Sequence, residues 1–446
     1  MDFSSKASRG RLAAMIGSKT VVLGFVLTLS CASQPKAVAG GQAATLSADG
    51  AWCWFADPRA ICGGPGERLF AAWVTKAGDI QVGALDARSG ETQIETLHAR
   101  LQHDDHDVPA LLALPDGRLA AFYSRHGGQK MWMRTSDKPW DISAWGEEKS
   151  LPVHTSHPPR KTITYANPIL LPEEGNRLWL FWRGDDWKPN LTWSDDLGRT
   201  FAPVQTLVKR KGAGLGNRPY TKVSQGRGGR IHVAFTDGHP RNEKFNSIHY
   251  LYYEKGAWHR ADGTIIGRLA DLPLDPDATD LVYDARPSGA RAWIWDIAED
   301  ASGHPVIVYT RLPTPTDHRY HYARYDRGRW IDHEITPGGP WFPETPRGKR
   351  EFENHYSGGI VLDHDDPNHV YLSRPTNPDT GVFEIEHWWT SDHGRTWKHE
   401  AITKDSQQNN VRPFVPRHHH APNPSVLWMH GPYVHYTHYQ TSIRYR

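Results

Sequence analysis

Residues 194–201 read SDDLGRTF, and residues 391–397 read SDHGRTW. The two stretches share a serine, an aspartate, a glycine, an Arg-Thr pair and an aromatic residue in the same order. In such a stretch the carboxylate can accept hydrogen bonds from turn amides, and the glycine can adopt a positive φ. The aromatic residue can then pack under the turn. Both stretches therefore predict hairpin turns in a β-rich protein.

Short aromatic or β-branched stretches recur along the chain, and their starts lie roughly 50–70 residues apart. Most of them follow a turn signal such as the Pro-Asp-Gly at 115–117. Because a propeller blade takes about 40–50 residues, this spacing predicts an all-β fold built from blades of about four strands. The predicted strands are 68–75, 118–124, 177–183, 230–236, 304–310, 369–373 and 426–429.

Charge and composition limit the class of partner. The formal net charge is only +2, so no strong overall field favours nucleic acid or a membrane surface. The 26 histidines can supply local positive charge or proton transfer near neutral pH. An anionic sugar polymer fits this pattern better than DNA, for which a lysine-rich stripe would be expected.

The first 39 residues have the features of an export signal. Basic residues precede an apolar run at 21–29, which is too short to span a bilayer. Processing could follow a lipoprotein route at Cys31 or ordinary cleavage after the Ala-Val-Ala at 37–39. We expect a secreted, periplasmic or lipid-anchored protein whose single propeller domain spans 40–446. Cys53 and Cys62 could form a disulfide in such a compartment or remain buried thiols.

Two histidines bracket a predicted hairpin. His106 lies in the polar run 103–107, before an apolar strand, and His126 follows the next strand. Since the start of one antiparallel strand lies beside the end of its partner, the two imidazoles could approach each other. A solvated polar rim and a metal site of His103, Asp105 and His106 are the alternatives, although that spacing is specific to no metal. The three histidines at 418–420 are expected in a loop.

A second hairpin has the same layout. Tyr165 lies at the start of one predicted strand, and Arg183 ends the next. A buried tyrosine usually packs in the core, and an arginine at a strand end is usually solvated. In a propeller, however, such positions in neighbouring blades can converge on one central face.

Several motifs together resemble a known family. The turns at 194–201 and 391–397 resemble Asp-boxes, or BNR repeats. The motifs at 52–60, 104–111, 123–126, 218–220, 236–240, 356–359, 371–374 and 412–413 are similar to those of the BNR-4 type propeller family, which includes ulvan lyases and rhamnose–glucuronate lyases. The resemblance implies a seven-bladed propeller.

The same resemblance implies an active site of two histidines, a tyrosine and an arginine. These roles fall on His106, His126, Tyr165 and Arg183. Arg177 is a competitor for the arginine, because the separation from Tyr165 to Arg183 is about two residues longer than the family pattern. Arg218 and Tyr220 are similar to the family's substrate contacts.

The implied function is a polysaccharide lyase that cleaves an acidic, uronate-containing polymer such as ulvan by β-elimination. Arg183 with His126 or His106 would neutralise the uronate carboxylate. Tyr165 could take the C5 proton, protonate the leaving O4 or do both, and His106 is the alternative base. Neighbouring cations are expected to lower the pKa of Tyr165. We expect a monomer that needs no cofactor for the chemistry, although it could hold a structural metal ion. A non-catalytic glycan-binding propeller and a sialidase-like hydrolase are the alternatives, and the latter would require three arginines and a Tyr–Glu pair.

Overall fold

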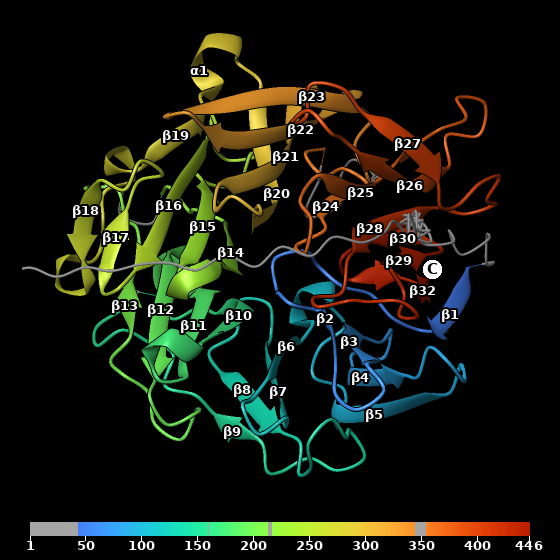
Figure 1. Cartoon of the computed structure of the whole chain (residues 1–446), viewed down its shortest axis with the longest axis horizontal. Coiled ribbons are helices and arrows are strands. Elements are labelled where there is room, and N and C mark those ends of the chain that lie inside the picture. Colours follow the sequence, from blue (N-terminus) through green and yellow to red (C-terminus); the bar gives the residue numbers. More distant parts are fainter. Residues whose placement is uncertain (1–42, 159, 213–215, 344–353) are drawn as a thin grey trace, which may run out of the picture. The chain divides into compact units, whose positions relative to one another are not determined.

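Seven antiparallel sheets surround a central axis in the computed structural model and form a seven-bladed β-propeller (Figure 1). The structure describes residues 43–158, 160–212, 216–343 and 354–446, which belong to a compact unit spanning Gln42–Arg446. The seven-bladed, all-β fold predicted from the sequence is confirmed. The predicted leader at 1–39, with Cys31 and the cleavage site at 37–39, lies outside the described residues.

In the first six blades the strands follow chain order from the central axis to the rim, except that β19 of blade four pairs with β16. Blades one to three contain β2 (Ala60–Gly63), β3 (Arg68–Val74), β4 (Ile80–Leu85), β5 (Thr92–His98), β6 (Ala110–Ala113), β7 (Leu119–Ser124), β8 (Met131–Thr135), β9 (Lys149–Ser150), β10 (Thr164–Leu171), β11 (Arg177–Arg183), β12 (Pro189–Ser194) and β13 (Gln205–Thr206). Blades four to six contain β14 (Thr221–Gln225), β15 (Ile231–Thr236), β16 (Ile248–Glu254), β17 (Ala257–His259), β18 (Ile265–Arg268), β19 (Asp280–Tyr283), β20 (Arg291–Glu299), β21 (Pro305–Thr314), β22 (Asp317–Asp326), β23 (Arg329–Gly339), β24 (Ile360–Leu362), β25 (His369–Pro375), β26 (Phe383–Trp389) and β27 (Lys398–Ala401).

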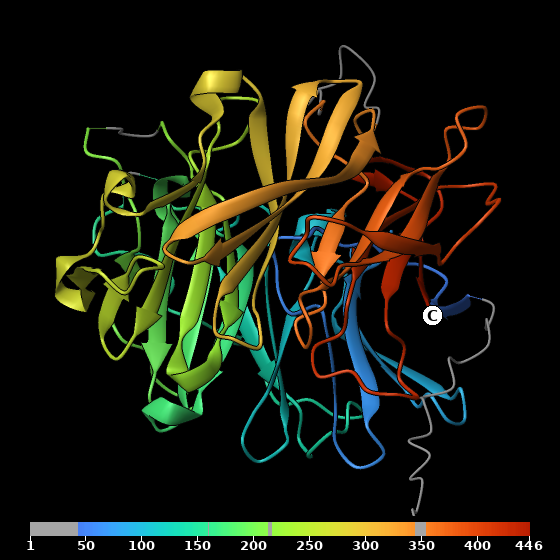
Figure 2. The same cartoon turned by 45° about the horizontal axis from the view of Figure 1, so that its top comes forward.

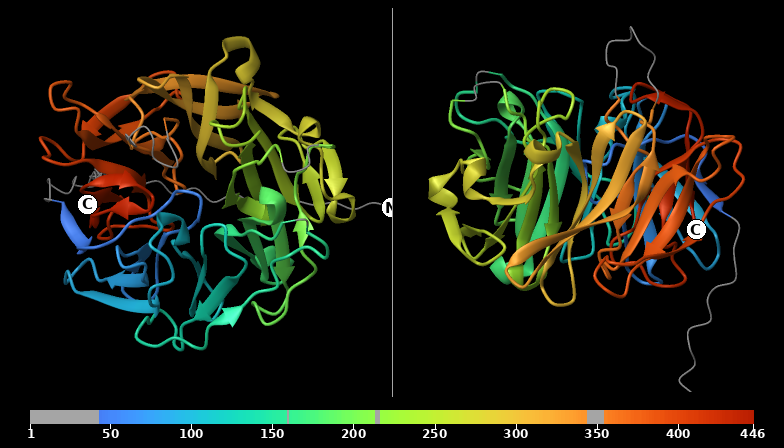
Figure 3. Two further views of the ribbon diagram at one scale, coloured as in Figure 1. Left: turned by 180° about the vertical axis from the view of Figure 1, so that it is seen from behind. Right: turned by 90° about the horizontal axis from the view of Figure 1, so that it is seen from above.

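The seventh blade joins the two ends of the described chain. Its strands are β28 (Asn410–Phe414), β29 (Leu427–His430), β32 (Ser442–Tyr445) and β1 (Ala44–Ser47). β1 pairs with β32 at the rim, where Ala44 lies opposite Tyr445 (Figures 2 and 3). This pairing places both ends of the described chain in one blade and closes the ring. β30 (Tyr433–His435) and β31 (His438–Tyr439) form a separate two-stranded hairpin.

Helical structure in the described residues is confined to single turns. They are α1 (Ala285–Ser288), η1 (Asp105–Asp107), η2 (Pro172–Glu174), η3 (Asp185–Trp187), η4 (Arg227–Gly229), η5 (Leu269–Asp271) and η6 (Pro276–Ala278). Among the described residues, no helix has the length and hydropathy that a membrane span requires.

The second strand of each blade is the element that the sequence revealed. β3, β7, β11, β15, β21, β25 and β29 fall on the seven predicted stretches. All six residues of β7 are buried, and so are six of the seven in β11. Because neighbouring blades cover both faces of these strands, their sequences are continuous apolar runs without polar alternation.

The two Asp-box turns join the third and fourth strands of blades three and six. The carboxylate of Asp196 accepts hydrogen bonds from the amides of Arg199 (3.0 Å) and Thr200 (2.8 Å) and from the Thr200 hydroxyl. Gly198 has φ 87°, as the sequence predicted. These hydrogen bonds lower the pKa of Asp196 to about 2, with the Thr200 amide contributing most.

Replacing Asp196 with Ala is expected to lower the melting temperature, because the turn amides lose their acceptor. The matched control is Asp195→Ala. The side chain of Asp195 is 64% exposed and pairs only with Arg177 among the described residues, so this change is expected to have little effect. Thermal unfolding followed by circular dichroism makes the comparison. Equal melting temperatures for the two variants would show that the turn does not depend on the Asp196 carboxylate.

Candidate active site

His106 and His126 lie side by side at one end of blade two. η1 places His106 just before β6, and His126 follows β7. Because β6 and β7 are antiparallel, with Ala110 opposite Phe122, the start of one strand adjoins the end of the other. The two imidazole rings are parallel, with an interplanar angle of 1° and centroids 4.0 Å apart. The predicted approach of the two histidines is thus present in the structure.

One buried carboxylate holds both rings. Asp104 caps η1 and accepts a hydrogen bond from the backbone amide of His106. Its Oδ1 lies 2.6 Å from Nδ1 of His106, and its Oδ2 lies 2.9 Å from Nδ1 of His126. Since an ionised carboxylate only accepts, each Nδ1 carries the proton that it donates to Asp104. Nε2 is therefore the atom of each ring that can exchange a proton with a ligand.

The pKa values of the two histidines that share this carboxylate are shifted in opposite directions. Burial alone would lower the pKa of His106, but the charge of Asp104 and its hydrogen bond raise that pKa well above 6.5. Burial and then the positive charge of His106 lower the pKa of His126 to about 4, against the effect of Asp104. At neutral pH the pair is therefore an imidazolium at His106 and a neutral imidazole at His126. The side chain of His126 is 23% exposed, so a ligand can reach it.

Two residues from the C-terminal part of the chain hold η1 in place through Asp105. Asp105 accepts hydrogen bonds from the Arg412 guanidinium and from the Tyr433 hydroxyl (2.5 Å). Oδ1 of Asp105 also lies 2.9 Å from Nδ1 of His106. That contact lacks hydrogen-bond geometry, because the ring donates to Asp104. Asp107 accepts from the backbone amide of His126 (2.8 Å) and so links the two ends of the hairpin.

Tyr165 occupies a bulge in β10. Its φ is 66°, which is unusual for a residue other than glycine, and the register with β11 shifts between Thr164 and Asn167. The ring centroid of Tyr165 lies 5.5 Å from that of His106. A backbone held in this region costs of order 1–3 kcal/mol and is typical of functional sites.

Arg183 lies beside Tyr165 at the end of β11. It donates to the Tyr220 hydroxyl (2.5 Å) and to the Thr164 hydroxyl (2.9 Å), and its guanidinium lies 4.9 Å from the Tyr165 ring centroid. Its buried Nε has no hydrogen-bond partner in the described residues. Arg177, the competing candidate, lies at the opposite end of β11 from Arg183 and pairs with Asp195 and Glu174. It is therefore not part of the site.

The prediction that neighbouring cations lower the pKa of Tyr165 is wrong. Burial raises that pKa well above 10, and the nearby Arg183 offsets this effect only in part. We had expected the neighbouring cations to dominate, but the phenol lies deep in an aromatic cluster with Phe55 and Tyr220. Tyr165 is therefore a neutral phenol that can donate a proton.

The match with a family model decides the classification. The model described as a BNR repeat-containing family member matches residues 68–337, well over half of the chain. The chain belongs to the BNR repeat-containing family. The resemblance seen in the sequence motifs is thus confirmed. Among curated proteins, no sequence matches this chain.

Solved structures with the same fold include two polysaccharide lyases. An ulvan lyase of family PL25, bound to -[GlcA(1-4)Rha3S]-, shares 16% identity and a TM-score of 0.66 over 90% of this chain and 95% of that chain. The polysaccharide lyase Uly1 shares 10% identity and a TM-score of 0.56 over 90% of this chain and 96% of that chain. At such identities the likeness establishes the propeller fold.

The predicted substrate contacts of this BNR-family propeller have different partners. Tyr220 accepts a hydrogen bond from Arg183 within the site. The guanidinium of Arg218 lies 3.7 Å from the ring centroid of Trp187. Burial lowers the pKa of Arg218, and the positive charges of Arg183, Arg160 and Arg241 lower it further, against Tyr220. Three other guanidinium groups therefore lie close enough to act on Arg218.

Other site residues escaped the sequence analysis. Tyr436 packs edge-on against both histidines, with centroids 4.7 Å from His106 and 5.3 Å from His126. His239 packs against Tyr220 and Trp293. The family motif at 236–240 contains His239 and offered a signal, whereas nothing local in the sequence distinguished Tyr436.

The alternative metal site of His103, Asp105 and His106 is not assembled among the described residues. His103 packs instead against Tyr439 with centroids 4.7 Å apart. Three other groups of described residues bring three possible ligand atoms together: Asp104, His106 and His126; Cys53, Asp105 and His106; and Asp363, Asp365 and His419. However, Asp104 already occupies Nδ1 of both imidazoles. Cys53 and Cys62 are both buried and free, so the disulfide alternative is wrong.

Replacing Asp104 with Asn is expected to lower the pKa of His106 by about one pH unit or more, because the ion pair is lost while burial remains. In the native protein, histidine NMR titration should show His106 protonated well above pH 6.5 and His126 titrating near 4. The matched control is Asp107→Asn, since burial raises the pKa of Asp107 and so favours the uncharged form that the amide resembles. If His106 titrates equally in both variants, Asp104 does not set its charge.

Proposed function

We propose that this propeller is a polysaccharide lyase that cleaves an acidic polymer at a uronic acid by β-elimination. The observation that carries the proposal is one cluster containing a guanidinium, an imidazolium, a neutral imidazole and a protonated phenol: Arg183, His106, His126 and Tyr165. The similarity to lyase structures, one of them bound to a glucuronate–rhamnose saccharide, supports the same class.

Elimination from a uronate needs its negative charge to be offset. Loss of the C5 proton next to a carboxylate creates a second negative charge in the transition state. Fixed cations beside the carboxylate stabilise that charge where it develops. We assign this role to the Arg183 guanidinium and the His106 imidazolium, which lie 4.9 Å and 5.5 Å from the centroid of the Tyr165 ring.

The same reaction needs a base for the C5 proton and an acid for the leaving O4. His126 is neutral at Nε2 and accessible, so it is our candidate for the base. This assignment replaces His106, whose Asp104 partner keeps it protonated. Tyr165, held as a phenol by burial, is the candidate for the acid.

The surroundings of the site favour a polyanion over a neutral glycan. Arg160, Arg218 and Arg241 raise the local positive charge although the whole chain carries only +2. Ulvan is our first candidate for the polymer. A substrate of this size lies outside the cell, which agrees with an exported, monomeric enzyme whose leader spans 1–39.

The alternative functions make different demands on the site. A sialidase would pair its tyrosine with a glutamate, whereas the described ring contacts of Tyr165 are His106, Phe55 and Tyr220. A non-catalytic glycan-binding propeller would need groups that contact the sugar but would gain nothing from one charged and one neutral imidazole at His106 and His126.

Tyr165→Phe is expected to reduce turnover by roughly 10²–10⁴-fold, because it removes the proton donor and keeps the packing. Arg183→Lys is also expected to reduce turnover, since Lys keeps the charge and loses the planar two-pronged grip on a carboxylate. Ultraviolet absorbance of the unsaturated uronate product measures both. Binding of uncut polymer should survive in Tyr165→Phe.

The control for these variants is Tyr322→Phe, which alters a buried tyrosine in blade five beside Trp397. Its turnover should match the native rate. Exhaustive chelation of folded protein should also leave turnover intact. Loss of turnover on chelation, restored by one divalent metal, would favour a metallo-hydrolase and contradict the proposed elimination.

A further inference from the structure

The segment 52–57 divides the centre of the ring into two compartments. Trp54 donates to the carbonyl of Ile294 in blade five, and the Trp52 indole donates to the carbonyl of Arg412 in blade seven. Asn167 in blade three accepts from the Asp57 amide and donates to the carbonyl of Phe55. Because the segment bonds to the innermost strands of three blades, it runs through the centre of the ring. The candidate active site lies on the side of this segment where the Phe55 ring packs against Tyr165.

A pocket of about 540 Å³ lies on the other side of this segment. Its lining includes the last residues of β6, β10 and β14, whereas His106 precedes β6 and Tyr165 is near the start of β10. The pocket therefore opens at the end of the inner strands opposite to the candidate active site. Its volume is in the range of pockets that hold small organic ligands. We call it the far pocket.

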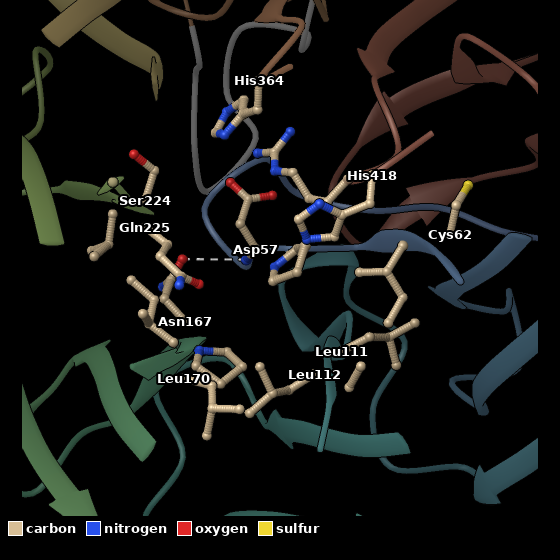
Figure 4. A pocket seen from close by; sticks show the side chains of 18 of the residues that line it. Asp57, Cys62, Leu111, Leu112, Asn167, Leu170, Ser224, Gln225, His364 and His418 are labelled. Atoms are coloured by element: carbon tan, nitrogen blue, oxygen red, sulfur yellow. Dashed lines mark hydrogen bonds between the residues drawn. The ribbon is translucent and has the colours of Figure 1, made fainter. Parts of the chain in front are cut away.

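The far pocket has one apolar wall and one polar wall (Figure 4). Leu111, Leu112 and Leu170 lie together on one side, next to backbone from β6 and β10. His364 and His418 lie on the other side, and Arg417 also lines the pocket. A ligand that fills this space needs an apolar body and a polar head.

The buried charges at the polar wall, where Asp57 lines the pocket, and behind it do not balance. Asp57 pairs with Lys222 and Arg59, and Asp296 lies 3.8 Å from Arg417. These three cations face only two carboxylates, which leaves one excess positive charge. His364 does not change this count, because burial and Arg417 lower its pKa and keep it neutral.

The remaining ionisable groups of the lining are engaged elsewhere or lie at its edge. Glu299 pairs with His232 and accepts from the Arg227 amide. The Arg227 guanidinium donates to the Ala301 carbonyl. Asp365 is exposed. Burial and Arg417 lower the pKa of His418, against the charge of Asp365.

Of these three cations, only Arg417 lines the pocket. Its side chain is only 12% exposed, and its one hydrogen bond among the described residues goes to the carbonyl of Val415 at 3.2 Å. A guanidinium has five donors and forms its strongest hydrogen bonds with a carboxylate or phosphate. The hydroxyl of Ser224, which is 5% exposed and lines the same pocket, also has no described partner. Such buried polar groups normally have partners.

We propose that the far pocket binds an organic monocarboxylate with an apolar body. Its carboxylate would receive hydrogen bonds from Arg417 and would cancel the single excess charge. Its body would lie on the leucine wall. This site is separate from the proposed lyase chemistry and does not depend on it.

Benzoate is the probe, and its neutral analogue benzamide and the body-less acetate are the controls. Isothermal titration and thermal shift should show saturable benzoate binding that raises the melting temperature. Benzamide and acetate should bind at least about tenfold more weakly, because charge-assisted hydrogen bonds are about twice as strong as neutral ones and acetate buries little apolar surface.

Arg417→Gln should weaken benzoate binding by about tenfold or more and remove the preference over benzamide. Arg227→Gln is the matched control, and Tyr165→Phe should bind benzoate like the native protein. Leu112→Asp, which places a carboxylate in the apolar wall, should exclude benzoate and tests the site if Arg417→Gln fails to fold. The proposal is overturned by the absence of saturable benzoate binding, by equal affinity for benzamide, or by native affinity in folded Arg417→Gln or Leu112→Asp.

Discussion

The Asp104 carboxylate, held between two parallel imidazoles, is the constraint on which the candidate site depends. Because both Nδ1 atoms donate to it, both rings present Nε2 in the same direction. One negative charge cannot hold two imidazolium ions 4.0 Å apart in a buried place, so one ring is charged and the other is neutral. A pair of identical side chains thereby acquires two different chemical roles.

The propeller places the parts of the site around this carboxylate. The histidines come from blade two, Tyr165 and Arg183 from blade three, and Arg412 from blade seven supports Asp105 from the other side. The seventh blade is completed by β1 from the other end of the described chain. Closure of the ring and the geometry of the site are therefore linked. Arg412 in β28 and Tyr433 in β30 belong to the same C-terminal part of the chain as β32, which pairs with β1.

The sequence predicted the elements that are fixed by local rules. The second strand of each blade was visible because burial on both faces makes it continuously apolar, as in β7 and β11. His106 and His126 could be brought together because antiparallel pairing relates the two ends of one hairpin. The closing pair of strands was not predicted, because β1 is short and its partner lies some 400 residues away. The direction of the Tyr165 pKa and the bridging role of Asp104 depend on tertiary burial, which a single sequence does not reveal.

The central claim is that the cluster around Asp104 breaks a glycosidic bond without adding water. The most direct measurement is digestion of a uronate-containing polymer, followed by mass spectrometry and ultraviolet absorbance of the products. The account predicts products that end in an unsaturated uronate and lack the mass of one water for each bond broken. Products that have gained one water for each bond broken and contain no double bond would contradict it.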